Sequence, residues 1–288
     1  MNLKVGIFVH PKRPKIPKRD IVDIVKSLDL KVSESPSSAD IALVIGGDGT
    51  FSHYGRRLSV PLLFVGLTDQ DTLGSKNNLS TISFKGLFNA LKQIKKGKYN
   101  IVSRKMISVI YSNFKPIDIL TDIYIERGIF AGCIRYTISV FKNMAIDNID
   151  GVIDENKQKA IFTDYVIGNG VIISTAFGST GYYAYVDRIM NGTSQIKSEL
   201  FDDNKIGICH ILPNFGVRKK INLKKETVMR KIHYTVPFKS LIKINVIRNA
   251  NVRLYGTTND SKGITVETNT SIIVRPSQKI AKIIKLSR

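Results

Sequence analysis

The first hundred residues alternate between apolar runs and stretches with helical spacing. Continuous apolar runs, typical of parallel strands buried on both faces, lie at residues 3–9, 41–45 and 61–67. Apolar positions three and four residues apart predict helices over residues 16–28 and 87–96, and a further helix is expected to begin near residue 51. Alternation of this kind predicts an α/β domain with a Rossmann-like parallel sheet and crossover helices.

The pattern changes near residue 100. Short β-rich segments, several of them alternating, follow at residues 117–125, 134–141, 171–174, 241–247, 252–255, 264–266 and 272–274. Gly, Asn and Asp separate these segments, which predicts an all-β domain built as a sandwich or layered sheet. We therefore expect two domains, residues 1–100 and residues 101–288, with a last segment that can pack back on the first domain.

Composition narrows the possible partners. The net charge is +21, from 44 Lys and Arg against 23 Asp and Glu, and the basic residues are spread along the chain. Abundant Lys and Ile with no Trp indicates an AT-rich genome, and no stacking aromatics interleave the basic segments, so nucleic acid is not the expected partner. A basic surface instead favours anionic substrates such as nucleotides.

Targeting and metal signals are weak. The N-terminal apolar run precedes its charges, the reverse of a secretory signal, and no apolar stretch approaches 18 residues. A cytoplasmic protein without membrane contact is therefore expected. The two cysteines, Cys133 and Cys209, form no zinc motif with a histidine.

One buried strand ends in a loop that carries chemistry. After residues 41–45 the chain reads Gly46-Gly47-Asp48-Gly49-Thr50. Glycines let backbone N–H groups approach a ligand, and a following helix N-terminus favours phosphate. A carboxylate among phosphate-binding groups needs a task, and Asp48 could bind Mg²⁺ or accept a proton from an attacking hydroxyl. The simpler alternative is a tight turn in which Asp48 caps the helix.

A second strand also runs into a turn of small and hydroxyl residues, Ser174-Thr175-Ala176-Phe177-Gly178-Ser179-Thr180-Gly181-Tyr182. Such a turn can hold polar ligand atoms, and its tyrosine can stack on a base. Taken alone, the segment is better explained as a polar strand-end turn.

Together, the two segments resemble the motifs of the NAD kinase family, which shares a superfamily with diacylglycerol and sphingosine kinases. The resemblance implies the two-domain architecture of that superfamily and a divergent member, with an archaeal origin expected. It implies transfer of a phosphoryl group from ATP or polyphosphate to the adenosine 2′-hydroxyl of NAD, which gives NADP, with Mg²⁺ or another divalent metal. It also implies a homodimer or homotetramer.

The resemblance assigns roles to particular residues. Asp48 is the expected general base, and no direct protein ligand to the metal is expected other than Asp48 itself. The donor phosphates are expected at Gly46, Gly47, Gly49 and Thr50. The NAD-binding residues are expected to be Thr121, Asp122, Asn169, Ser174, Thr180, Gly181 and Tyr182.

The chain departs from the family on the acceptor side. Thr121-Asp122 stands where the family has Asn-Glu or Asn-Asp, Asn169 replaces an acid, and the Asn and first Gly of a family stretch are replaced in residues 66–74. Two alternatives therefore stay open. One is a kinase of the same superfamily with a lipid or another nucleotide as acceptor, and the other is a non-catalytic protein that binds nucleotides or nucleic acid on this fold.

Overall fold

The computed structural model describes residues 3–10, 17–67, 79–112, 114–129, 132–142, 159–184, 186, 202–220, 226–229, 232–248, 251–257 and 262–287. The chain divides into two compact units, one formed by Met1–Arg104 with Ile280–Arg288 and the other by Lys105–Lys279. Each unit has its own core of buried apolar residues.

The first unit is built on a parallel sheet with strand order β4-β3-β1-β2. These strands are β1 (Lys4–Val9), β2 (Lys31–Val32), β3 (Ile41–Gly46) and β4 (Leu62–Gly66), with the short β5 (Ile82–Ser83) beside β4. The end of β19 (Ser271–Leu286) joins this sheet where Ile283 pairs with Leu62. Strand order therefore reverses at β1, and ligands of open α/β sheets bind at the carboxyl ends of strands near such a point.

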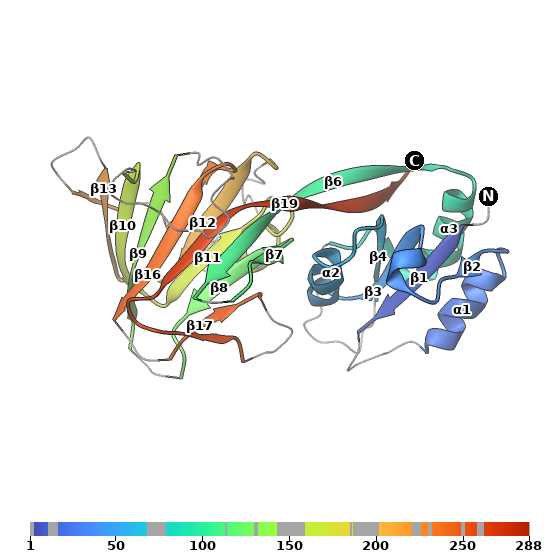
Figure 1. The fold of residues 1–288 in the computed structure, drawn as a ribbon, viewed down its shortest axis with the longest axis horizontal. Helices are drawn as coiled ribbons and strands as arrows, with labels where there is room; N and C mark the ends of the chain where they lie inside the picture. Colours follow the sequence, from blue (N-terminus) through green and yellow to red (C-terminus); the bar gives the residue numbers. More distant parts are fainter. Residues whose placement is uncertain are drawn as a thin grey trace. The chain divides into compact units, whose positions relative to one another are not determined.

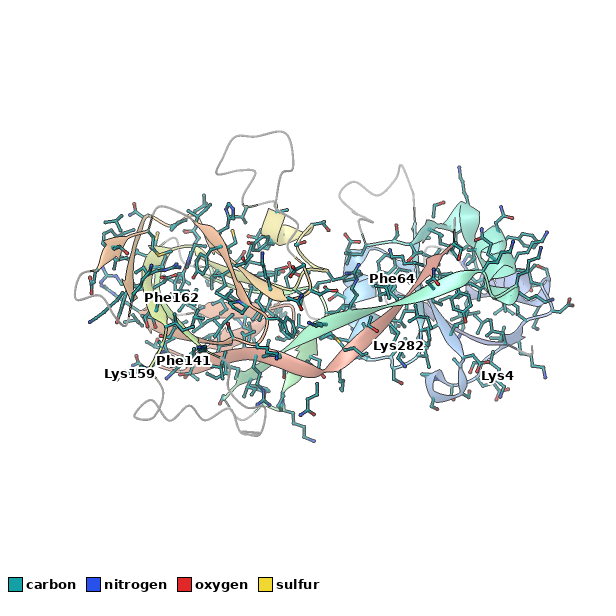
Figure 2. The ribbon with its side chains drawn as sticks, turned by 90° about the horizontal axis from the view of Figure 1, so that it is seen from above. Lys4, Phe64, Phe141, Lys159, Phe162 and Lys282 are labelled. Atoms are coloured by element: carbon teal, nitrogen blue, oxygen red, sulfur yellow. The ribbon has the colours of Figure 1, made fainter. Side chains whose placement is uncertain are left out.

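Helices cover both faces of this sheet. The helices are α1 (Lys18–Lys26), α2 (Asp48–Gly55) and α3 (Leu87–Lys95), with short 3₁₀ turns at Pro36–Ser38 and Phe84–Gly86. Ile21 of α1 and Leu91 of α3 belong to the core that contains Leu43 of β3. Phe51 of α2 instead stacks on Phe64 of β4, with ring centroids 4.5 Å apart (Phe64 is labelled in Figure 2). Successive strand residues face opposite sides, so α2 covers the face opposite α1 and α3.

The second unit is a sandwich of two antiparallel sheets (Figure 1). One sheet has the order β14-β13-β10-β9-β16-β19, and the other has the order β15-β12-β11-β8-β17-β18. The first contains β9 (Ile134–Phe141), β10 (Phe162–Gly168), β13 (Phe215–Lys220), β14 (Thr227–Val228) and β16 (Leu241–Arg248). The second contains β8 (Asp122–Glu126), β11 (Gly170–Ser174), β12 (Lys205–Ile211), β15 (His233–Pro237), β17 (Val252–Tyr255) and β18 (Ile264–Val266). The long β6 (Tyr99–Tyr111) pairs with β7 (Ile117–Ile119).

Alternation along the strands builds the core between these sheets. On β8, Ile123 and Ile125 are buried in the same cluster as Ile138 of β9 and Ile244 of β16. The residues between them, such as Tyr124, therefore face the other side of the sheet.

A charged cluster lies inside this apolar core. Asp164 of β10 is fully buried, and Arg218 of β13 donates two hydrogen bonds to its oxygens at 2.6 and 2.7 Å. Tyr234 of β15 donates a third at 2.5 Å, so the cluster joins both sheets. Burial raises the pKa of Asp164, but the hydrogen bonds from Arg218 and the other partners outweigh burial and hold that pKa below its usual value.

Aromatic rings and a histidine complete the cluster. The Arg218 guanidinium lies 3.9 Å from the centroid of the Phe162 ring (labelled in Figure 2) and 4.3 Å from that of Tyr234. His210 is buried, with Nε2 3.7 Å from Asp164 Oδ2. Tyr136 donates its hydroxyl to the Gly170 carbonyl, so the 2.9 Å contact between that hydroxyl and His210 Nδ1 requires a proton on Nδ1.

The predicted fold class, an α/β unit followed by a β-rich unit, is confirmed. The expected strand at residues 117–125 is divided into β7 and β8, because the backbone bends at Leu120-Thr121. The expected strand at residues 272–274 is part of the longer β19. Within the described residues, no helix is long and apolar enough to cross a bilayer.

Candidate functional site

The Gly46–Thr50 loop lies at the carboxyl end of β3, next to β1. Every residue of β3 is buried, and Gly47 is the N-cap residue of α2, its carbonyl accepting hydrogen bonds from Thr50 and Phe51. Tyr54 of the same helix donates its hydroxyl to the carbonyl of Val9, the last residue of β1, at 3.1 Å. The loop is thus fixed at the sheet edge where strand order reverses.

The glycines of this loop differ in their surroundings. A Cβ on Gly46 would lie 2.7 Å from the Thr50 hydroxyl oxygen and 2.8 Å from its Cβ, so Thr50 packs directly on Gly46. Gly49 is exposed, and a Cβ there would meet no atom within 4 Å. Packing therefore explains Gly46 but does not explain Gly49.

Asp48 is the first residue of α2, where the helix dipole stabilises its negative charge. Its side chain is partly exposed, and Oδ1 accepts a hydrogen bond from the Leu79 backbone N–H at 3.1 Å. This contact fixes the orientation of the carboxylate. The arrangement suits both expected roles, a general base and a metal ligand.

The second motif folds into a compact turn against β8. The Thr175 N–H donates to the Thr121 carbonyl at 2.8 Å, and the Thr175 hydroxyl donates to the Leu120 carbonyl at 2.6 Å. Gly178 lies so close to Thr121 that a Cβ would be 2.5 Å from its carbonyl carbon. These contacts bring the second motif together with the Thr121-Asp122 pair.

Asp122 lies between two glycine contacts. A Cβ on Gly256, which has φ +88°, would lie 2.5 Å from the Asp122 carbonyl oxygen. A Cβ on Gly181 would lie 3.8 Å from Asp122 Oδ2, so the carboxylate is next to the residue that precedes Tyr182. Thr121, Asp122, Gly181 and Tyr182 therefore share one region of the second unit.

Other expected site residues lie apart from this region or are covered. Ser174 is opposite Asp122 in the sheet but is fully buried, and its hydroxyl donates to the Thr175 carbonyl at 3.0 Å. Asn169 precedes β11, at the end opposite Ser174, which is about 16 Å away along an extended strand. Thr180 is partly exposed in the turn. Of residues 66–74, only Gly66 and Leu67 lie within the described residues.

The sequence did not indicate an aromatic group beside this region. Tyr182 Oη donates to Glu126 Oε1 at 2.5 Å, and its ring contacts Tyr124 edge-on, with centroids 5.1 Å apart. Tyr124 also stacks on Tyr255, with centroids 5.0 Å apart. Burial first, and then the charges of Asp122 and Glu126, raise the pKa of Tyr124 to about 12. Counting alternate residues from Asp122 would have placed Tyr124 and Glu126 on the same face.

Proteins similar to this chain in sequence include several NAD kinases. An NAD kinase from Clostridium beijerinckii is 27% identical over 239 residues, which cover 78% of this chain and 72% of that protein. An NAD kinase from Lachnoclostridium phytofermentans is 34% identical over 161 residues, and one from Clostridium kluyveri is 30% identical over 176 residues. The chain spans about half the length of these two relatives, 48% and 54% respectively. No family model matches the chain.

Solved structures share the fold over the whole chain. An NAD kinase from Archaeoglobus fulgidus in complex with ATP matches 99% of this chain and 94% of its own, with a TM-score of 0.62 and 15% identity. Yeast NADH kinase complexed with NADH matches 99% of this chain and 83% of its own, with a TM-score of 0.64 and 16% identity. The chain therefore shares its fold with these two kinases.

The sequence relatives agree with the structural neighbours. The three relatives named above are NAD kinases, and the two motifs that suggested the resemblance lie on the matched fold. The chain is a divergent homologue of the NAD kinases.

Proposed function

We propose that this protein is an NAD kinase, a phosphotransferase that acts on the adenosine 2′-hydroxyl of NAD and forms NADP. The observation that carries the proposal is Asp48, a partly exposed carboxylate held at a glycine-rich strand end by the Leu79 N–H, in a homologue of NAD kinases. ATP is the proposed donor, and polyphosphate stays an alternative.

The donor side uses the loop of the first unit. The backbone at Gly46, Gly47 and Gly49 and the N-terminus of α2 suit phosphate oxygens, because backbone N–H groups and the dipole favour negative charge. The buried Thr50 supports this backbone through its contact with Gly46. We expect phosphate contacts to come mainly from the backbone.

Mg²⁺ is expected to enter with the donor. Among the described residues no group of three His, Cys, Asp or Glu side chains could form a protein cage for a metal. Mg²⁺ commonly uses one or two carboxylates together with substrate phosphates and water, and Asp48 beside the phosphate-binding backbone suits such a site. When bound, the metal would neutralise charge on the transferred phosphoryl group.

Asp48 then acts on the acceptor hydroxyl. Its carboxylate accepts the hydroxyl proton as the oxygen attacks the γ-phosphorus and the bond to the leaving phosphate breaks. Most of the acceleration comes from positioning and charge neutralisation.

The acceptor side uses the second unit. Asp122 and Thr121 are the proposed ribose and base contacts, with Thr180, Gly181 and Tyr182 as further NAD-binding residues. The Thr121 hydroxyl can supply one donor, which is less than the Asn amide of the family supplies. Ser174 and Asn169 stay predictions, with Ser174 better suited to supporting the turn.

Replacing the catalytic carboxylate tests the proposal. An asparagine in place of Asp48 would keep an oxygen that can accept the Leu79 N–H but would lose the charge and the proton acceptor. We expect Asp48→Asn to lower kcat by a factor on the order of a hundred or more, with substrate binding nearly unchanged. The measurement is a coupled assay of NADP formation from NAD, ATP and Mg²⁺.

Asp23→Asn, which removes an exposed carboxylate from α1, is the control and should retain the wild-type rate. An unaltered kcat in Asp48→Asn would refute the role of Asp48. If the wild type gives no NADP but ATP still raises its melting temperature, the acceptor is another molecule.

We further propose a homodimer or homotetramer. The neighbouring strands β10, β13 and β14 carry a row of apolar residues, Tyr165, Val217 and Val228, in which Tyr165 is 39% and Val228 70% exposed. Exposed apolar rows of this kind mark interfaces between proteins. Light scattering after size-exclusion chromatography tests this proposal, and the cytoplasmic location stays a prediction.

A further inference from the structure

The outer face of β8 carries a group of side chains that packing alone does not require. Asp122, Tyr124 and Glu126 alternate with core residues, so all three face away from the interior of the sandwich. Tyr124 and Glu126 are half-buried. So are Tyr182 and Tyr255, whose rings contact Tyr124, and the Tyr182 hydroxyl binds Glu126. This group is therefore neither core nor fully exposed surface.

Glu126 fixes the tyrosine of the second motif at its far end. Its carboxylate accepts the Tyr182 hydroxyl hydrogen bond at 2.5 Å, and hydrogen bonds to charged acceptors are stronger than those between neutral groups. The ring of Tyr124 contacts the same ring at an interplanar angle of 85°. Tyr182 is thus held both at its hydroxyl and by a ring contact, which limits rotation about its χ angles.

The sheet register brings these residues together. Glu126 pairs with Gly170 of β11 and with Arg253 of β17, and Tyr124 pairs with Tyr255. Because Gly170 has no side chain, none from that position competes with Tyr182 for Glu126. The same strand places Asp122 next to Gly181, so Glu126 and the proposed ribose contact are on one face.

We propose that Glu126 is a positioning residue for NAD, acting through Tyr182, whose ring it holds in place to receive the adenine base. The inference rests on the proposed function and adds to it a residue outside both motifs. A preorganised ring loses less entropy when the base stacks on it, so Glu126 should affect the binding of NAD and not that of the phosphoryl donor.

Paired variants test this inference by calorimetric NAD binding and by steady-state kinetics. Glu126→Ala should weaken NAD binding and raise the KM for NAD by roughly tenfold to a hundredfold, while kcat and the KM for ATP stay within about twofold. Glu126→Gln keeps an acceptor oxygen and should recover most of the loss. Tyr182→Phe should weaken binding similarly, and the Glu126→Ala/Tyr182→Phe double variant should be no weaker than the single variants.

Controls separate positioning from folding. Glu226→Ala removes an exposed carboxylate of the same unit, and Tyr165→Phe removes an exposed hydroxyl from β10. Both should bind NAD as the wild type does. Melting temperatures identify any variant that fails to fold. If Glu126→Ala fails to fold, NAD binding by Glu126→Gln and by Tyr182→Phe, compared with that of the wild type, tests the inference.

Each outcome has a separate meaning. A wild type that makes NADP, with Glu126→Ala binding NAD normally, overturns the inference and leaves the proposed function standing. Additive effects in the double variant, or equal losses for NAD and ATP, also overturn it. A wild type that neither binds NAD nor makes NADP removes the proposed function, and the inference with it.

Discussion

Two tyrosine–carboxylate hydrogen bonds lie on opposite sides of one sheet. Tyr234 donates to Asp164 inside the sandwich, and Tyr182 donates to Glu126 on the outer face, both at 2.5 Å. The inner carboxylate is completely buried and is paired with Arg218, whereas the outer pair is half-buried beside the second motif. The same tyrosine–carboxylate hydrogen bond therefore occurs in two environments, which differ in burial and in charge compensation.

The two carboxylates differ in how the fold compensates their charge. A buried carboxylate requires a paired cation, because removing either partner leaves the other as a buried charge whose desolvation is not compensated. The outer region is held by backbone hydrogen bonds and by glycine contacts such as Gly178 on Thr121.

The largest expected effect comes from breaking the inner pair. Asp164→Asn leaves Arg218 without its charge partner and should lower the free energy of unfolding by about 3–5 kcal/mol. Glu126→Gln should lower it by less than about 1 kcal/mol, because its surroundings are partly solvated. Urea denaturation followed by far-UV circular dichroism measures both, since the chain has no Trp.

A second substitution checks the reason for this loss. Adding Arg218→Met to Asp164→Asn removes the unpaired charge and should recover part of the stability. Equal losses for Asp164→Asn and Glu126→Gln would contradict the comparison.

Acid titration provides the next test. The pKa of Asp164 is lower in the folded protein than in the unfolded chain, so the carboxylate contributes stability above its unfolded pKa of about 3.9. That contribution is lost as pH falls through the folded value. The difference in stability between the wild type and Asp164→Asn should therefore shrink below about pH 4. A difference that stays constant from pH 7 to pH 3 would exclude a charged Asp164 as the cause.

The sequence predicted the local features of the fold. The apolar run at residues 41–45 identified β3, and the glycines after it identified the loop that the structure places at the sheet edge. The strands at residues 134–141 and 252–255 were predicted to the residue, because turn residues flank their apolar positions. Local pattern suffices where both ends of an element carry signals.

Features that depend on distant pairing could not be predicted. β19 extends over Ser271–Leu286, although Pro276 and several charged residues interrupt its apolar pattern, because different ends pair with β16 and β4. Glu126 and Tyr182 are 56 residues apart, and only the register of β8 with β11 brings them together. His210 likewise gave no signal of its contacts with Tyr136 and Asp164.

An effect smaller than that of Asp164→Asn is expected at the glycine contact that holds the outer region. Gly178→Ala would place a Cβ 2.5 Å from the Thr121 backbone, and the required shift should cost about 1–3 kcal/mol. Because the shift moves Thr121 and Asp122, the KM for NAD should rise as well. Gly132→Ala is the control, since a Cβ at that exposed position would meet no atom within 4 Å. If Gly178→Ala is as stable as Gly132→Ala and binds NAD normally, backbone contact does not shape the outer region, and the contrast with the inner charge cluster fails.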